Sequence, residues 1–370
     1  MSGPRLNPDL MNVPLYIAGK SIEEVKEELG LSSVIKLASN ESPIGPSPLA
    51  MQAAECMLQQ AHRYPGIAER DLRRKLAAKL DGKLEEGHIV VGNGGTDVLR
   101  MITQAFVFDG GNTVMSRVTF PMYHILTSTF GGTCRQVEPT RELHHDLAAM
   151  ADMIDEDTRL VYLCSPNNPT GLIITQVEAD EFIARVPPHV VVVFDESYHD
   201  YVTDPAQVNS LAYIEDGHNV LSVRSFSKVS GLANLRVGYL IGPVTLANYV
   251  RRTSLPFHSG DIALVAAAAS LDDSTYQIQH LKVVREGREF LYEALHKLGL
   301  ASIPSQANFQ LIMNLPVEAV TLADALLHRG IVVRPMSAFG MPEGIRVTVG
   351  KPDDNQQFIA GLQQVLEAYS

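Results

Sequence analysis

Two predicted strands end in side chains that could carry out chemistry on a small molecule. Asp195 directly follows the apolar run 190–194, and two serines and Lys228 follow the run 220–223 within five residues. Ligands in open α/β sheets bind beyond the carboxyl ends of the strands, so these groups are expected to face a common site. A lysine amine near a carboxylate is suited to nucleophilic and proton-transfer chemistry.

Two further strand ends add groups that bind anions and polar atoms. The run 89–91 leads into the glycine-rich GNGGTD ending at Asp97, and the run 160–164 leads into SPNNPTG. Glycines at the start of a helix let backbone N–H groups face a phosphate. The dinucleotide fingerprint GxGxxG is absent because its third glycine would fall at Asp97, and no GxxxxGK[ST] loop occurs. Pyridoxal 5′-phosphate (PLP), with its phosphate, ring nitrogen and aldehyde, would use all four strand ends.

The elements that must position these groups alternate along the chain. Short β-branched runs typical of strands buried on both faces alternate with helical patterns from about residue 47 to 260. We therefore predict an α/β fold, a mostly parallel sheet sandwiched by helices, as the large domain, residues 45–260. A smaller α+β domain would comprise 1–44 and 261–370, with a long helical stretch over 261–298 broken near 272–274. Further strands are expected near 309–313, 331–333 and 345–349, and helices near 319–328 and 353–368.

Composition excludes several classes of partner. The 370 residues contain 42 Asp+Glu against 30 Lys+Arg, a formal net charge of −12, whereas nucleic-acid and anionic-membrane binders need a basic face. The three cysteines are widely spaced and form no CxxC, so neither a disulfide framework nor a zinc site is indicated. Two histidine-containing pairs, at 144–145 and 199–200, lack a complete ligand set, so we expect no metal. We expect a cytoplasmic protein without membrane partners.

Three segments, in this order and spacing, resemble PLP-dependent aminotransferases of fold type I. They are SPNNPTG (165–171), FDESY (194–198) and SFSKVSGLANLRVG (225–238). Within that fold type the chain most resembles the histidinol-phosphate aminotransferases. The further segments that carry this resemblance are KLASNESPIGPSP (36–48), RYPG (63–66), VGNGGTD (91–97), IVVRP (331–335) and IRVTVG (345–350).

The resemblance implies roles around the cofactor ring. Lys228 would form the Schiff base with PLP and then shuttle a proton once the substrate displaces it. Asp195 would pair with the pyridinium nitrogen, while Asn168 and Tyr198 would hydrogen-bond the phenolic oxygen. Phe120, in VTFPMY, would stack on the ring.

The resemblance also implies phosphate and substrate contacts. Tyr64 would reach the phosphate from the neighbouring subunit, which implies a homodimer with shared active sites. Arg346 would clamp a substrate carboxylate, Arg334 would contact the donor phosphate, and Asn168 and Tyr16 are further expected substrate contacts. The remaining phosphate ligands would be Gly95, Thr96, Ser225, Ser227 and Arg236.

The implied activity is transamination of L-histidinol phosphate with 2-oxoglutarate in histidine biosynthesis, by a ping-pong mechanism. Three features depart from the common family pattern: the segments at 40–45 (NESPIG) and 255–260 (LPFHSG), and Thr96-Asp97 in place of the usual acidic pair after the glycines. An aromatic or broad-specificity amino acid aminotransferase is therefore the alternative on the same scaffold. The segment SFSK also matches the S-x-x-K motif of penicillin-binding proteins, but no Lys-Thr-Gly or Lys-Ser-Gly accompanies it.

Overall fold

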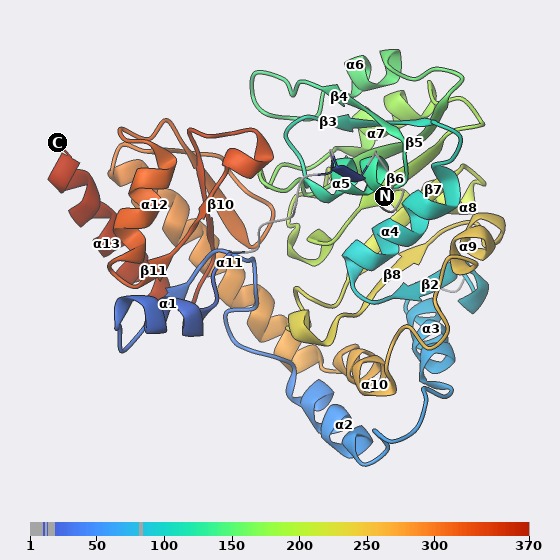
Figure 1. The fold of residues 1–370 in the computed structure, drawn as a ribbon, viewed down its shortest axis with the longest axis horizontal. Helices are drawn as coiled ribbons and strands as arrows, with labels where there is room; N and C mark the ends of the chain where they lie inside the picture. The colour runs from blue at the N-terminus through green and yellow to red at the C-terminus, as the bar shows by residue number, and fades with distance from the viewer. Residues whose placement is uncertain (1–9, 12, 14–18, 81–83, 370) are drawn as a thin grey trace, which may run out of the picture.

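The computed structural model describes residues 10, 11, 13, 19–80 and 84–369 (Figure 1). Its larger part is built on a seven-stranded sheet and its smaller part on a four-stranded sheet. In spatial order the large sheet consists of β2 (Ile89–Gly92), β8 (Gly238–Ile241), β7 (Val220–Ser225), β6 (Val191–Asp195), β5 (Thr158–Cys164), β3 (Asn112–Ser116) and β4 (Thr133–Val137).

The large sheet is mostly parallel, as the sequence predicts. Only β8 runs antiparallel to its two neighbours, β2 and β7, within this sheet of the described chain. In the register of the central strands, Cys164 lies opposite Asp195, and Asp195 lies opposite Val223. The carboxyl ends of β5, β6 and β7 therefore meet at one edge, which explains why their loops can contribute to a single site.

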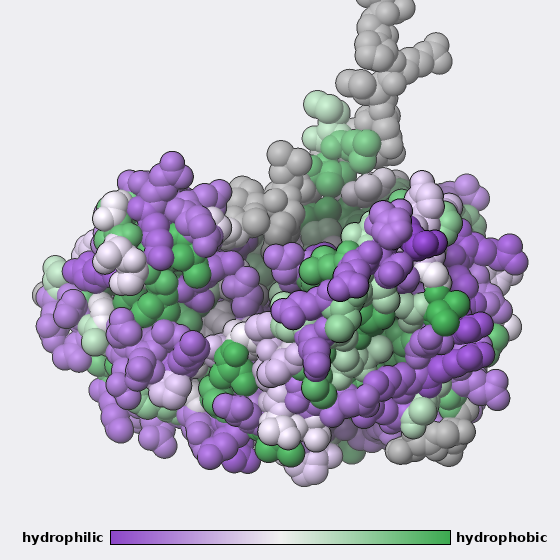
Figure 2. Space-filling view, turned by 90° about the horizontal axis from the view of Figure 1, so that it is seen from below, coloured by the Kyte–Doolittle hydropathy of each residue, from purple (hydrophilic) through white to green (hydrophobic). Residues whose placement is uncertain are grey.

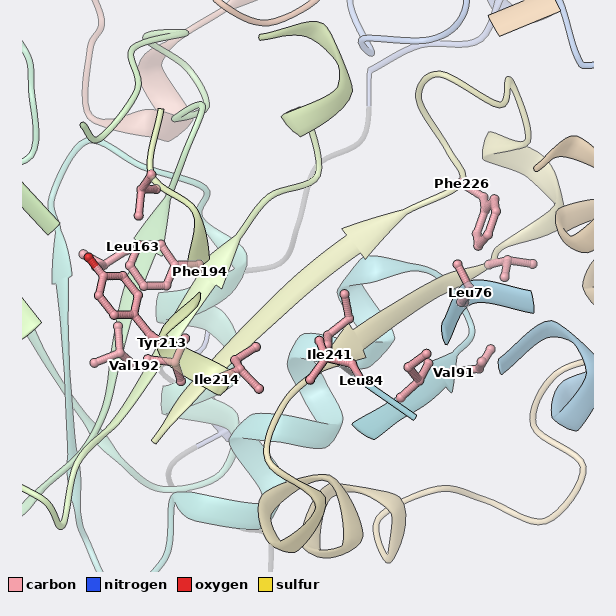
Figure 3. Close-up of a cluster of buried hydrophobic side chains, with 14 of the residues drawn as sticks. Leu76, Leu84, Val91, Leu163, Val192, Phe194, Tyr213, Ile214, Phe226 and Ile241 are labelled. Atoms are coloured by element: carbon pink, nitrogen blue, oxygen red, sulfur yellow. The ribbon is translucent and has the colours of Figure 1, made fainter. Parts of the chain in front are cut away.

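Both faces of the large sheet are covered by helices, because successive side chains of a strand point to opposite faces. On β5, Val161 and Leu163 belong to one apolar cluster, whereas Leu160 and Tyr162 belong to the other. Figure 3 shows part of the first cluster, including Leu163. Its helices are α2 (Pro48–Leu58), α3 (Ala68–Ala78), α6 (Leu147–Asp152), α7 (Gln176–Ile183), α8 (Ser210–Glu215) and α10 (Asp261–Ser270). The opposite face is covered by α4 (Gly95–Phe106), α5 (Met122–Thr129) and α9 (Val244–Arg251).

The predicted helix break at 272–274 is confirmed. After α10, a new helix, α11 (Ser274–Lys297), begins with Asp273 as its N-cap, whose carboxylate accepts a hydrogen bond from the Tyr276 N–H. The same carboxylate accepts from the Ser47 hydroxyl at 2.6 Å, so the cap also fixes the start of α2. In Figure 1, α11 runs from beside α10 into the smaller part.

The smaller part packs helices on an antiparallel sheet. Its strands are β12 (Arg334–Pro335), β13 (Ile345–Thr348), β10 (Phe309–Met313) and β9 (Ala301–Ser302), in that order. One apolar cluster joins this sheet to α11, α12 (Ala319–Leu327) and α13 (Pro352–Tyr369). The N-terminal segment joins this part through α1 (Ile22–Leu29) and through β1 (Ile35–Lys36), which pairs in parallel with β11 (Ile331–Val332). The domain boundaries at 44/45 and 260/261 stay a prediction.

The surface combines charge with scattered apolar residues. Figure 2 shows one face on which hydrophilic residues predominate and hydrophobic patches lie between them. None of the described helices is both long enough and apolar enough to cross a bilayer.

Candidate active site

A pocket of about 260 Å³ lies where the strand ends of the large sheet approach the smaller part. It gathers residues that are far apart in the chain, from Gly19 to Arg346. The structure brings together these predicted site residues: Gly95, Thr96, Phe120, Asn168, Asp195, Tyr198, Ser225, Ser227, Lys228, Arg236, Arg334 and Arg346. Tyr64 does not line this pocket, and Tyr16 lies outside the described residues.

Lys228 follows β7 and projects into the pocket. Its Nζ donates a hydrogen bond to the Asn40 carbonyl oxygen at 3.1 Å and lies 5.2 Å from the centre of the Tyr198 ring. Burial and the nearby Arg346 charge lower the pKa of Lys228 to about 8. About a tenth of this amine is therefore free base at pH 7, far more than for an ordinary lysine, and the free base is the form that acts as nucleophile and proton carrier.

Asp195, the last residue of β6, is buried and firmly held. Its Oδ1 accepts from the Ser197 hydroxyl at 2.6 Å and from the Ser197 N–H at 3.1 Å, and its Oδ2 accepts from the Tyr123 hydroxyl at 2.8 Å. Burial raises the pKa of Asp195, and these hydrogen bonds counter the rise. The carboxylate is thus oriented to accept a proton or a hydrogen bond from a basic nitrogen in the pocket.

Tyr198 lies beside two amide side chains. Asn40 Nδ2 donates to Tyr198 Oη at 2.9 Å, and Asn168 Nδ2 approaches the same oxygen at 3.4 Å. Burial raises the pKa of Tyr198 above its ordinary value, so the phenol stays protonated and can donate into the pocket. These three side chains form a polar cluster in the lining of the pocket.

An anion cradle forms where β2 leads into α4. The N-cap of α4 is Gly94, with φ +90° and no capping side chain, so the first N–H groups of the helix remain available to a ligand. A Cβ on Gly94 would lie 2.3 Å from Arg236 Nη2, so a glycine is required for the guanidinium to lie there. Ser225 and Ser227 line the same pocket. Backbone N–H groups, hydroxyls and a guanidinium are the donor set that fits a phosphate.

Two arginines from neighbouring strands of the smaller part line the site. Arg334 on β12 is paired directly with Arg346 on β13, and both line the pocket. Arg346 is only 5% exposed, and its guanidinium carbon lies 5.2 Å from the centre of the Phe309 ring and 5.5 Å from the centre of the Phe339 ring. It donates to the Asn168 side-chain oxygen and to a backbone carbonyl. This packing presents a planar donor that suits a carboxylate.

Tyr64 lies on the loop between α2 and α3, with 80% of its surface exposed. Its ring stacks on Phe257 at a centroid distance of 4.7 Å, and Phe257 is itself 60% exposed. Leu255 and Ile67, in the same two loops, are also more than 60% exposed. Such apolar exposure is typical of a surface that another molecule covers.

Sequence reasoning missed three residues of this site. Asn40 is buried with φ +55° and contacts both Tyr198 and, through its carbonyl, Lys228. Tyr123 and Ser197 hold the Asp195 carboxylate. The sequence offered little to identify them. Ser197 could have been noticed because it lies two residues after Asp195, but nothing in the local sequence connects Asn40 with β6, which begins more than 150 residues later.

The comparisons with known proteins agree with this geometry. A family model for "Aminotransferase class I and II" matches residues 32–362, so the chain belongs to that family. The histidinol-phosphate aminotransferase of Moorella thermoacetica is 40% identical over 364 residues, which cover 98% of this chain and 93% of that protein. The corresponding protein of a Geobacillus species is 40% identical over 362 residues, covering 98% of both chains.

A solved structure has the same fold. The histidinol-phosphate aminotransferase of Sinorhizobium meliloti, determined in complex with pyridoxal-5′-phosphate, superposes with a TM-score of 0.89 at 24% identity. The match covers 100% of this chain and 99% of that one. The predicted fold type is therefore confirmed.

Proposed function

We propose that the chain is a PLP-dependent aminotransferase that transfers the amino group of L-histidinol phosphate to 2-oxoglutarate. The observation that carries this proposal is one pocket that combines Lys228, Asp195 and the anion cradle at Gly94 and Arg236. Membership of the aminotransferase family and the names of relatives at about 40% identity agree with it.

The chain's own groups fit the cofactor and divide its chemistry among them. When bound, PLP supplies an aldehyde that reacts with amines and a ring that withdraws electrons from the reacting carbon. The cradle would hold its phosphate, and Asp195 would keep a proton on the ring nitrogen. Tyr198 and Asn168 would donate hydrogen bonds to the phenolic oxygen, and Phe120 would pack against the ring. Lys228 would supply the amine that reacts with the aldehyde and, as a free amine, would move a proton during the transfer.

The paired arginines give the site two anion-binding groups for its two substrates. Arg346, held between two phenylalanine rings, would bind the carboxylate of the 2-oxo acid. Arg334 would bind the phosphate of the amino donor. The donor and the acceptor would use the same pocket in turn, which is a ping-pong sequence. The alternative is an aromatic or broad-specificity donor, which the apolar lining by Phe120 and Phe339 would accommodate.

We further propose a homodimer in which Tyr64 contributes to the partner's site. The exposed stack of Tyr64 and Phe257, with Leu255 and Ile67 beside it, supports an interface at this surface. The three cysteines are free in the structure, in keeping with the proposed cytoplasmic location.

Lys228→Ala tests the proposed function, with the exposed Lys282→Ala as its matched control. Purified wild-type protein and the control should bind PLP, absorb in the visible region and transfer the amino group of histidinol phosphate to 2-oxoglutarate. Lys228→Ala should bind PLP without this turnover. A wild-type protein that binds no PLP would refute the proposal.

A further inference from the structure

We propose that Tyr123 is a positioning residue for transamination, which orients the Asp195 carboxylate that would pair with the ring nitrogen of the cofactor. Its hydroxyl donates a hydrogen bond to Asp195 Oδ2 at 2.8 Å, and its side chain is fully buried. The inference rests on the proposed function, because the ring nitrogen belongs to PLP.

The two oxygens of Asp195 depend on donors from different elements. Ser197, two residues further along the same strand end, serves Oδ1 with its hydroxyl and its N–H. Tyr123 comes from α5, which packs on the sheet face that Val191 and Val193 of β6 also line, and no other group of the described chain donates to Oδ2. Ser197 alone would leave the carboxylate free to rotate about the Oδ1 contacts, and the Tyr123 bond removes that freedom.

Tyr123 is itself fixed by two aromatic neighbours. Its ring stacks on Tyr162 at 4.7 Å with an interplanar angle of 4°, and it meets the edge of Phe120 at 5.8 Å and 85°. Phe120 lines the pocket, three residues before Tyr123 at the start of α5. One turn of chain therefore supplies both the ring expected to cover the cofactor and the hydroxyl that orients its carboxylate partner.

The hydroxyl also affects the charge of Asp195. Burial raises the pKa of Asp195, and the bonds from Ser197 and Tyr123 oppose that rise. Burial and the Asp195 charge raise the pKa of Tyr123, so its proton stays in place to donate. Without this bond a larger fraction of Asp195 would be neutral, and a neutral carboxyl cannot stabilise a positive ring nitrogen. The other titratable groups around Asp195 are Cys164, Glu196, Tyr198 and Lys228.

The experiment compares Tyr123→Phe with Tyr162→Phe. Both variants remove one buried hydroxyl from the same aromatic stack, but Tyr162 Oη contacts Thr103 at 2.7 Å rather than Asp195. Two quantities are measured: the equilibrium dissociation constant of PLP, and the pH midpoint at which the absorption band of the bound cofactor changes. Tyr123→Phe should raise the dissociation constant about tenfold or more and move the midpoint by at least half a pH unit. Tyr162→Phe should change the constant less than threefold and leave the midpoint in place.

A double-mutant cycle provides the second measurement. With Asp195→Asn in place, adding Tyr123→Phe should change the PLP dissociation constant less than twofold, because the carboxylate that Tyr123 serves is gone. Equal effects of the two phenylalanine variants, or additive effects in the cycle, would show a packing role only and overturn the inference. In that case wild-type protein would still bind PLP, so the proposed function would stand; a wild type that binds no PLP would overturn both.

Discussion

The lowered pKa of Lys228 makes a quantitative prediction about cofactor uptake. Burial and the Arg346 charge bring this pKa to about 8, while Glu41 acts in the opposite direction. At pH 7 about a tenth of the amines are then free base, against roughly one in 3,000 for an unperturbed lysine. Uptake of PLP by the cofactor-free protein should therefore accelerate with pH and level off above a midpoint near 8.

Two charge-neutralising variants should move this midpoint in opposite directions. Arg346→Gln removes a repelling charge and should raise it by about half to one pH unit, whereas Glu41→Gln removes an attracting charge and should lower it. Arg285→Gln, on the exposed surface of α11, is the matched control and should leave it unchanged. The assay follows absorbance after stopped-flow mixing with PLP from pH 6 to 10. Shifts of the same sign in both variants, or a wild-type midpoint near 10, would refute the electrostatic account of Lys228.

Two further variants test substrate recognition and stability. Arg334→Ala should lower kcat/KM about a hundredfold for a phosphorylated donor but less than fivefold for an unphosphorylated one. The exposed Arg329→Ala is the control. Equal losses for both donors would contradict the phosphate contact. Glu196→Gln should reduce the free energy of unfolding in urea by about 3–5 kcal/mol, because Glu196 is fully buried and its loss leaves Arg224, which is 16% exposed, without its carboxylate partner at 2.9 Å. The exposed Glu181→Gln should cost less than about 0.5 kcal/mol. Burial acts to raise the pKa of Glu196, but Arg224 and two serine hydroxyls hold it below its ordinary value. The stabilisation by the Glu196–Arg224 pair should therefore be complete above about pH 4.3, the ordinary pKa of a glutamate, and should disappear as the pH falls through the lowered pKa of Glu196. If Glu196→Gln were still less stable than the wild type at lower pH, the stabilisation would not come from this ion pair.

The sequence predicted those elements of the fold whose pattern of apolar and polar residues matches their burial in the structure. The central strands read as continuous apolar runs because both of their faces are covered, and the break before α11 was visible as consecutive aspartates, one of which caps the helix. The strand β4 was missed because it lies at the edge of the sheet, where its sequence, TCRQV, is mostly polar and partly exposed. An edge strand needs no apolar alternation, so periodicity could not reveal it.

Site residues that directly follow a predicted strand could be identified from the sequence. Residues that reach the site only through tertiary contacts could not. Lys228 and Asp195 stand directly after buried strands, and the structure places both in the pocket. Asn40 reaches the site from the N-terminal segment through a left-handed backbone conformation, and Tyr123 reaches Asp195 from α5, a helix about 70 residues earlier in the chain. Such contacts depend on tertiary packing, which no local spacing encodes. The roles of the predicted residues toward cofactor and substrate stay predictions.

The central claim is that this pocket transfers the amino group of a phosphorylated imidazole donor. Its most direct test is kcat/KM for L-histidinol phosphate, phenylalanine and tyrosine, each measured with 2-oxoglutarate and the same PLP-loaded protein. From the proposed function we expect kcat/KM for histidinol phosphate to exceed that for both aromatic amino acids by at least tenfold, about 1.4 kcal/mol of transition-state stabilisation. A tenfold advantage for phenylalanine or tyrosine would contradict the claim and identify an aromatic aminotransferase instead.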